Sequence, residues 1–342
     1  MTQGMKPVIF GLAGPVLGAE ERALFRAARP AGYILFKRNI VDPAQLRALT
    51  DDLRDLDGRD DLPILIDQEG GRVARMQPPL WPAFPAAGAP FGALYEVSPI
   101  AAIEAVRSNA QALALMLREA GITVDCLPLL DVRQEGADDI IGDRAFGTDP
   151  LRVAALGRAV IEGLRRGGCV GVVKHMPGHG RATADSHKAL PVVGASAAEL
   201  ESDLAPFRRL KDAPMGMTAH VVYTAWDAER PASLSPIVIE EVIRGAIGFD
   251  GFLMSDDIDM KALSGTPAEK AAGVVAAGCD AALDCWGRFD EMAAIAEALD
   301  EMADVSVARL ERAMATIGAR IDVGAGDGVA LAAKRDALLG YA

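Results

Sequence analysis

The sequence lacks the features that mark several large classes of protein. It has only four cysteines in 342 residues, and none of them forms a CxxC pair. A disulfide scaffold is therefore disfavoured, and buried free thiols in a reducing compartment are the expected state. No apolar run reaches the ~18 residues that a membrane span needs. The net charge is -13 and no basic stripe with interleaved aromatic residues occurs, so we expect neither a membrane nor a nucleic-acid partner.

The N-terminus carries only a faint targeting signal. An apolar run from Pro7 to Leu17 follows Lys6 and is similar to the hydrophobic part of a signal peptide. Pro15 interrupts this run, the basic region before it is thin, and the run also fits a first β-strand. We therefore expect a cytoplasmic protein.

The chain does contain a repeated alternation of strand-like and helix-like segments. Eight short apolar or β-branched runs recur, at Val8–Ala13, Tyr33–Phe36, Pro63–Ile66, Thr123–Leu130, Val170–Val173, Met215–Ala219, Phe252–Met254 and Asp280–Leu283. Helix-like segments lie between them, at Ala19–Ala28, Pro43–Leu56, Ile100–Ala120, Pro150–Arg166, Ala197–Lys211, Ser235–Ile247 and Pro267–Ala277, with one or two more in Glu291–Ile317. Asp42-Pro43 and Thr266-Pro267 are typical helix starts.

This alternation predicts the fold class. Buried parallel strands read as continuous apolar runs, and eight β-then-α units favour an α/β fold, a (β/α)8 TIM-type barrel. We expect a single catalytic domain over residues 1–342, with 324–342 as a C-terminal loop and helix. A doubly wound sheet is the alternative. It usually has a GxGxxG turn after its first strand, whereas this chain has Gly11-Leu-Ala-Gly14-Pro15.

Polar residues collect directly after four of the apolar runs. These clusters are Asp67-Gln-Glu-Gly-Gly-Arg-Val-Ala-Arg75, Asp131 with Ile141-Gly-Asp-Arg-Ala-Phe-Gly147, Lys174-His175, and Ser255-Asp256-Asp257. The carboxyl ends of barrel strands and the loops after them carry the chemistry of such proteins. The sequence therefore predicts that these clusters meet in one site.

Asp256 and Asp257 end the seventh predicted strand. Because neighbours on a strand face opposite sides, Phe252, Met254 and Asp256 should share a face and Asp257 should lie on the other. Only Asp256 is then expected to point into the mouth of the barrel. A carboxylate there can act as a nucleophile, a base or a metal ligand, although an Asp-Asp pair also suits a helix cap.

Three of the four histidines lie in one stretch, KHMPGHGRATADSH, from Lys174 to His187. His175 and His179 have the i, i+4 spacing of a helical zinc site, but Pro177-Gly178 between them breaks a helix, so we expect no metal. Asp185 and His187 are two apart, and in an extended loop such residues project to the same side. The carboxylate can then orient the imidazole and raise its pKa for acid–base catalysis, or the pair can be a simple surface salt bridge.

These motifs resemble those of a known family. KHMPGHGRATADSH is similar to the KH-F-PGHG-x4-DSH signature of glycoside hydrolase family 3, in its branch of bacterial β-N-acetylglucosaminidases. The segments IDQEGGRVARM, LPLLDV, IGDRAFGTDP and MSDDIDM resemble other motifs of that branch in the same order. Two departures are Met176, where phenylalanine is usual, and Asp259, where a serine is common.

The resemblance implies a retaining mechanism, with Asp256 as the nucleophile, His187 as the general acid/base and Asp185 as the partner of that histidine. It also implies that Asp67 accepts hydrogen bonds from the terminal sugar. Four further residues would donate to that sugar, namely Arg75, Arg144, Lys174 and His175. His179 is expected to hold the base of the loop, and His220 either lines the pocket wall or lies in the core.

The implied substrate is a terminal β-linked N-acetylglucosamine, typically carried on anhydro-N-acetylmuramic acid from recycled cell-wall fragments. Its only partner would be this muropeptide-like carbohydrate, with no metal or organic cofactor. Three alternatives stay open at this point. They are substrate-assisted hydrolysis by the acetamide, a phosphorylase that uses phosphate as acceptor, and a non-catalytic sugar-binding barrel.

Overall fold

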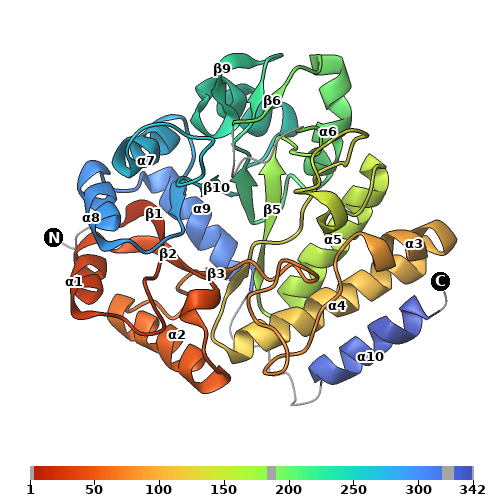
Figure 1. Ribbon diagram of the computed structural model, residues 1–342, viewed down its shortest axis with the longest axis horizontal. Helices are drawn as coiled ribbons and strands as arrows, with labels where there is room; N and C mark the ends of the chain where they lie inside the picture. The colour runs from red at the N-terminus through yellow and green to blue at the C-terminus, as the bar shows by residue number, and fades with distance from the viewer. Residues whose placement is uncertain (1–3, 183–189, 318–326, 341–342) are drawn as a thin grey trace.

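The protein is a closed eight-stranded parallel barrel surrounded by helices (Figure 1). The computed structural model describes residues 4–182, 190–317 and 327–340. The barrel strands close in the order β1-β11-β10-β7-β5-β4-β3-β2. Their bounds are β1 Lys6–Gly11, β2 Pro30–Leu35, β3 Ile64–Ile66, β4 Val124–Asp125, β5 Val170–Met176, β7 Met215–Thr218, β10 Phe252–Asp257 and β11 Ala281–Asp284. Each overlaps one of the eight predicted runs, and the predicted TIM-type barrel is confirmed.

Side chains alternate between the two faces of the barrel wall. Ile9 packs with Ile34, Val172 and Phe252 in the interior of the barrel. Phe10, the neighbour of Ile9, belongs instead to the large cluster between the strands and the helices. Because both faces of every strand are covered, the strands read in the sequence as continuous apolar runs.

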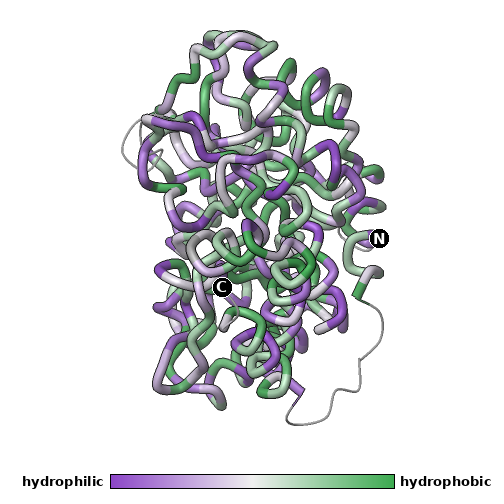
Figure 2. The backbone as a smooth tube through the Cα atoms, turned by 90° about the vertical axis from the view of Figure 1, so that its right-hand side faces the viewer, coloured by the Kyte–Doolittle hydropathy of each residue, from purple (hydrophilic) through white to green (hydrophobic). Residues whose placement is uncertain are grey.

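The helices form the outer layer. Their bounds are α1 Ala19–Ala28, α2 Pro43–Asp57, α3 Ala89–Val97, α4 Pro99–Glu119, α5 Pro150–Arg166, α6 Ala197–Arg209, η4 Val238–Ile247, α7 Pro267–Ala276, α8 Phe289–Ala298, α9 Asp304–Ala315 and α10 Asp327–Leu339. Figure 2 shows hydrophobic and hydrophilic residues alternating along the outer helices, which is the pattern of helices buried on one side only. The helix starts predicted at Asp42 and Thr266 are present, because each side chain accepts a hydrogen bond from a backbone N–H of the first turn.

Three elements differ from the sequence-based expectation. Helix α3 was not predicted, because its sequence contains both proline and glycine. The segment predicted as a regular helix at Ser235–Ile247 is a π-helix from Val238. A small sheet of β6 Val192–Val193, β8 Val222–Tyr223 and β9 Asp227–Pro231 lies outside the barrel. Its strands are too short, and β9 too charged, to show an apolar alternation.

Helix α10 lies alongside α4 near the C-terminus (Figure 1). Arg335 is buried at this contact and donates to the side-chain oxygen of Asn109 at 2.9 Å. The four cysteines are free and buried, as expected. None of the described helices combines the length and the hydropathy that crossing a bilayer requires.

Candidate active site

A cavity of about 320 Å³ opens at the carboxyl ends of the barrel strands. Six residues predicted from the sequence line it together, namely Asp67, Arg75, Arg144, Lys174, His175 and Asp256. They come from the ends of β3, β5 and β10 and from the loop after β4. The volume falls in the usual range for a small-molecule site. The prediction that the polar clusters after the strands meet in one place is confirmed.

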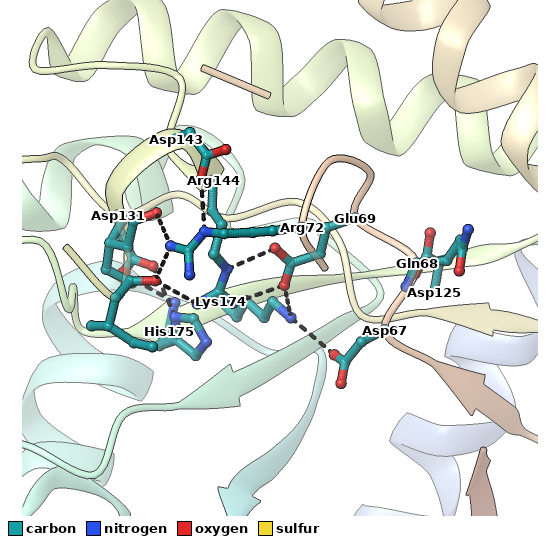
Figure 3. A network of polar contacts seen from close by, with 12 residues as sticks. Asp67, Gln68, Glu69, Arg72, Asp125, Asp131, Asp143, Arg144, Lys174 and His175 are labelled. Carbon is teal, nitrogen blue, oxygen red and sulfur yellow. Dashed lines mark hydrogen bonds and ion pairs between the residues drawn. The ribbon is translucent and has the colours of Figure 1, made fainter. Parts of the chain in front are cut away.

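The loop after β3 is held in shape by Gln68, which is itself buried (Figure 3). The backbone N–H of Gln68 donates to Asp125 Oδ1 at 3.0 Å. Its side-chain oxygen accepts from the N–H groups of Arg75 and Met76 at 2.8 and 3.0 Å, and its amide nitrogen donates to the Met76 carbonyl. One glutamine thus folds residues 67–76 back on themselves and turns the side chains of Asp67 and Arg75 toward the cavity.

A network of alternating charges forms one wall of the cavity (Figure 3). Lys174 Nζ lies 2.7 Å from Glu69 Oε1 and 3.2 Å from Asp67 Oδ1. Arg144 makes two parallel bonds of 2.8 Å with Glu69, and Arg75 Nη2 lies 2.9 Å from Asp67 Oδ2. Such charge-assisted, bidentate pairs fix the position of each partner.

This network keeps its members ionised although they are buried. Burial opposes the charge on Asp67, but Lys174 and Arg75 outweigh it and lower the pKa of Asp67. Glu69 is in the same position, and its pKa is lowered by Lys174 and Arg144. Burial likewise opposes the charge on Lys174, but Glu69 and Asp67 raise its pKa. The wall therefore offers fixed cationic donors and anionic acceptors, which is what a ring of sugar hydroxyls requires.

His175 is oriented by Asp131, which is fully buried. The Nδ1 atom of His175 lies 2.8 Å from Asp131 Oδ2. The other carboxylate oxygen of Asp131 accepts from the backbone N–H groups of His175 and His179 at 3.2 and 2.7 Å. Burial raises the pKa of Asp131, but its contact with His175 outweighs burial and lowers the pKa overall, so Asp131 stays an acceptor. Lys174 and His175 are joined by a cis peptide bond, and both line the cavity.

Asp256 and Asp257 both line the cavity, so the expectation that Asp257 faces away is wrong. The register between β10 and β11 shifts between Met254 and Asp257, and this irregularity breaks the strict alternation of sides. The Asp257 carboxylate accepts from the N–H groups of Asp259 and Cys285 and from Trp286 Nε1. Burial, and then the charge of Asp256, raises the pKa of Asp257 to about 6.

Asp256 is held differently from its neighbour. Its Oδ1 accepts the backbone N–H of Asp257 at 2.8 Å. Burial opposes its ionisation, but His175, the backbone N–H of Asp257 and Lys174 outweigh burial and lower its pKa. Asp256 is therefore an oriented, ionised carboxylate, which is the state a nucleophile requires.

His220 is not among the residues that line the cavity. It is fully buried, with Nδ1 2.7 Å from Ser233 Oγ and Nε2 2.9 Å from the Asp257 carbonyl. Burial lowers its pKa, so the neutral ring donates from Nε2 to the carbonyl and accepts from the serine. The sequence left His220 either on the pocket wall or in the core. The structure places it in the core, where its bond to the Asp257 carbonyl supports the end of β10.

Four residues that line the cavity or orient its side chains were not predicted from the sequence to do so, namely Glu69, Asp131, Arg72 and Asp257. Glu69 and Asp131 stood in the polar clusters after β3 and β4, and that position was the available signal. Their partners are far away along the chain, so no local pattern could identify the pairs.

A second hollow of about 670 Å³ adjoins the first and shares Arg72 with it. Among the described residues, none of those predicted as catalytic or sugar-binding lines it. Its arginines are each paired with an acidic side chain, in the pairs Arg72–Asp143, Arg133–Asp139 and Arg152–Glu96. The convergence of orienting contacts on the smaller cavity makes that cavity the candidate active site.

Comparison with known proteins decides the family. The description of the N-terminal domain of glycosyl hydrolase family 3 matches residues 16–319. The chain belongs to glycosyl hydrolase family 3. The β-hexosaminidase of Bordetella avium is 38% identical over 284 residues, which are 82% of this chain and 80% of that protein. The β-hexosaminidase of Alkalilimnicola ehrlichii is 41% identical, with the same shares of each chain.

Solved structures of family 3 members have the same fold. NagZ from Neisseria gonorrhoeae, in complex with N-trifluoroacetyl-D-glucosamine, is 32% identical with a TM-score of 0.85, covering 99% of this chain and 98% of that one. A family 3 β-N-acetylglucosaminidase from a Paenibacillus species is 31% identical with a TM-score of 0.85. That protein is longer, and the match covers 97% of this chain and 66% of that chain.

The predicted acid–base pair of this family 3 chain, Asp185 and His187, lies outside the described residues. The described part of that motif ends at Ala182, which is buried. His179 is buried there, as expected for the base of the loop, and it also lines the cavity. Tyr223 donates from its hydroxyl to the Gly178 carbonyl at 2.8 Å and fixes this turn.

Proposed function

We propose that the chain is a retaining β-N-acetylglucosaminidase that removes terminal β-linked N-acetylglucosamine. The observation that carries the proposal is the ionised Asp256, held at the end of β10 in the same cavity as the Asp67–Lys174–Glu69 network. The family and the names of its relatives agree with this activity.

In the proposed reaction the sugar hydroxyls are bound by Asp67, Arg75, Arg144, Lys174 and His175. A carboxylate oxygen of Asp256 attacks the anomeric carbon while the bond from that carbon to the leaving oxygen breaks. His187, with Asp185 as its partner, donates the proton that the leaving oxygen takes up. Water then attacks the glycosyl ester, His187 takes a proton from this water, and Asp256 is released as a carboxylate.

The electrostatics of the cavity favour an acid that comes from outside the described wall. Asp67 and Glu69 have lowered pKa values and are fully engaged with cations, so neither holds a proton near neutral pH. Asp257 sits on the nucleophile's own strand end, with its carboxylate bound by three N–H donors. This supports the assignment of a histidine from the adjoining segment as the acid.

A second histidine needs a direct test, because His175 and Asp131 also form a pair at the cavity. We assign His175 to sugar binding and His187 to proton transfer. His187→Ala should then slow natural substrates strongly and slow substrates with very good leaving groups least, whereas His175→Ala should slow both alike. A leaving-group dependence that appears with His175→Ala instead would reverse the two roles.

The experiment that tests the nucleophile is covalent trapping. A fluorinated N-acetylglucosaminyl fluoride reacts with the enzyme faster than the resulting glycosyl-enzyme is hydrolysed. The covalent sugar label should therefore be found on the peptide that contains Asp256. Asp257→Asn is the matched control and should still be labelled at Asp256. An absence of any label would favour attack by the substrate's own acetamide.

The natural substrate that we propose is N-acetylglucosaminyl-anhydro-N-acetylmuramic acid, with or without its peptide, in the cytoplasm. Hydrolysis is measured as release of free N-acetylglucosamine. The same assay with inorganic phosphate added tests the alternative acceptor, because a phosphorylase would release the sugar 1-phosphate. A protein that binds the disaccharide without cleaving it would be a sugar-binding barrel and not an enzyme.

A further inference from the structure

The rim of the cavity carries an aromatic side chain that the proposed chemistry does not use. Trp286 follows strand β11 and its surface is 48% exposed. Among the described residues that line the cavity, only Trp286 and Arg72 are exposed, and the others are partly or fully buried. A large amphipathic ring left in water beside a binding cavity is a typical contact surface for a ligand.

The indole is held in place before any ligand arrives. Its Nε1–H donates to Asp257 Oδ2 at 3.1 Å, and the guanidinium of Arg288 lies 5.1 Å from the ring centre. Gly287 has a φ of +67°, and a Cβ there would lie 2.3 Å from the Leu12 carbonyl carbon. Only glycine allows this turn to approach the end of β1 so closely. A surface that is already ordered loses little entropy when it binds.

The position of Trp286 relative to Asp256 indicates which part of a substrate it meets. The inner cavity contains Lys174 and Glu69, both almost fully buried, and a sugar gripped there fills much of the 320 Å³. The carboxylate that anchors the indole belongs to Asp257, the direct neighbour of Asp256. Trp286 and Arg72 are the exposed residues of the described lining, so a group attached to the anomeric oxygen passes one of them on its way out of the cavity, and Trp286 is the one bonded to the neighbour of Asp256.

We propose that Trp286 is a binding platform for the leaving group, and that its exposed indole face stacks on the C–H face of the sugar ring beyond the scissile oxygen. This proposal rests on the proposed function. It makes Trp286 a residue that sets specificity for an attached sugar, because the C–H face of a sugar is apolar and the indole face carries partial negative charge.

The test compares two substrates that share the same N-acetylglucosamine but differ in the leaving group. One is the disaccharide N,N′-diacetylchitobiose, and the other is N-acetylglucosaminyl fluoride, which has no second ring. Trp286→Ala should raise KM for the disaccharide by about tenfold and change kcat/KM for the fluoride by less than about twofold. Trp286→Phe should retain most of the disaccharide affinity, because it keeps a ring but loses the bond to Asp257.

The control is Phe289→Ala, which removes an exposed aromatic ring from the same segment outside the cavity lining and should change neither substrate. Equal losses on both substrates with Trp286→Ala would overturn the proposal, since the ring would then act on the shared sugar or through Asp257. Unchanged kinetics on both would overturn it as well.

A binding measurement separates this proposal from the proposed function. The chain has three tryptophans, and the other two are partly buried. In an Asp256→Asn chain the disaccharide should shift tryptophan emission to the blue, while free N-acetylglucosamine should not, and adding Trp286→Phe should abolish the shift. If the unaltered chain hydrolyses neither substrate, the proposed function fails, but this titration still tests whether Trp286 binds the second sugar ring. An emission shift that persists without Trp286, or no shift at all, would overturn the proposal for Trp286.

Discussion

Lys174 and Glu69 form an ion pair that is almost fully buried at the base of the cavity, with Nζ 2.7 Å from Oε1. Glu69 also holds Arg144 through two parallel bonds, so one carboxylate places two cations of the cavity wall. Breaking one partner of a buried pair leaves an uncompensated charge, which costs far more than the pair itself contributes.

Glu69→Gln should therefore lower both stability and activity. We expect the free energy of unfolding to fall by about 3 kcal/mol, because Arg144 loses its only described acidic partner and Lys174 keeps only Asp67. Chemical denaturation and kcat/KM are the measurements. Glu104→Gln, which alters partly exposed pairs with Lys334 and Arg107, is the matched control and should cost under about 1 kcal/mol. Equal costs for the two variants would contradict this account.

Asp131→Asn should disturb His175 without emptying the space that Asp131 fills. The amide can no longer accept on both sides, and its NH2 group facing Nδ1 would force the ring proton onto Nε2. We expect kcat/KM to fall by roughly 10–100-fold, the usual cost of altering the partner that orients a functional histidine. Nitrogen NMR of the imidazole reports the tautomer. A ring that keeps its proton on Nδ1 would refute the prediction.

Because of Asp284, the free energy of unfolding should fall as the pH rises. Its side chain is buried, and Oδ2 has no hydrogen-bond partner in the described part of the chain. Burial, and then the charge of Asp257, raises the pKa of Asp284 to about 7. The folded state thus holds the proton more tightly than the unfolded state, whose pKa is near 3.8. This contribution is fully present below about pH 4 and is lost as the pH rises toward 7.

Asp284→Asn removes this dependence, and at pH 8 it should stabilise the protein by on the order of 2 kcal/mol. The measurement is the melting temperature of both proteins from pH 4.5 to 8. Their difference should grow with pH and then level off above 7. Asp290→Asn, at an exposed position in α8, should follow the unaltered chain throughout. A constant difference across the whole range would show that Asp284 is already ionised in the folded state.

Gly180→Ala should impair turnover more than folding. A Cβ at Gly180 would lie 2.0 Å from the Val132 carbonyl oxygen, so this part of the PGHG turn would have to move away from the loop after β4. Because Asp185 and His187 follow it, we expect kcat to fall by about tenfold or more, with a smaller effect on the melting temperature. Gly194→Ala meets nothing within 4 Å and should leave both quantities unchanged. Similar kinetics for the two variants would disprove this role of the turn.

Local patterns predicted the barrel well because its strands are buried on both faces. Every predicted apolar run overlaps a barrel strand, and α1 and α5 have the predicted bounds. The polar clusters were found for the same reason, since the end of an apolar run marks the end of a strand. Helix α3 and the β6-β8-β9 sheet were missed because their sequences lack a sustained period and depend on packing against the barrel.

Sequence by itself determined that the chain forms a (β/α)8 barrel and that Asp67, Lys174, His175 and Asp256 stand at strand ends. These properties are local, because they depend on the periodic burial of neighbouring residues. Only the tertiary structure decided that Glu69 joins Lys174 to Arg144 and that a register shift brings Asp257 to the cavity beside Trp286. Those relationships join residues from different strands, so their free energy depends on closure of the barrel and has no signature in any single segment.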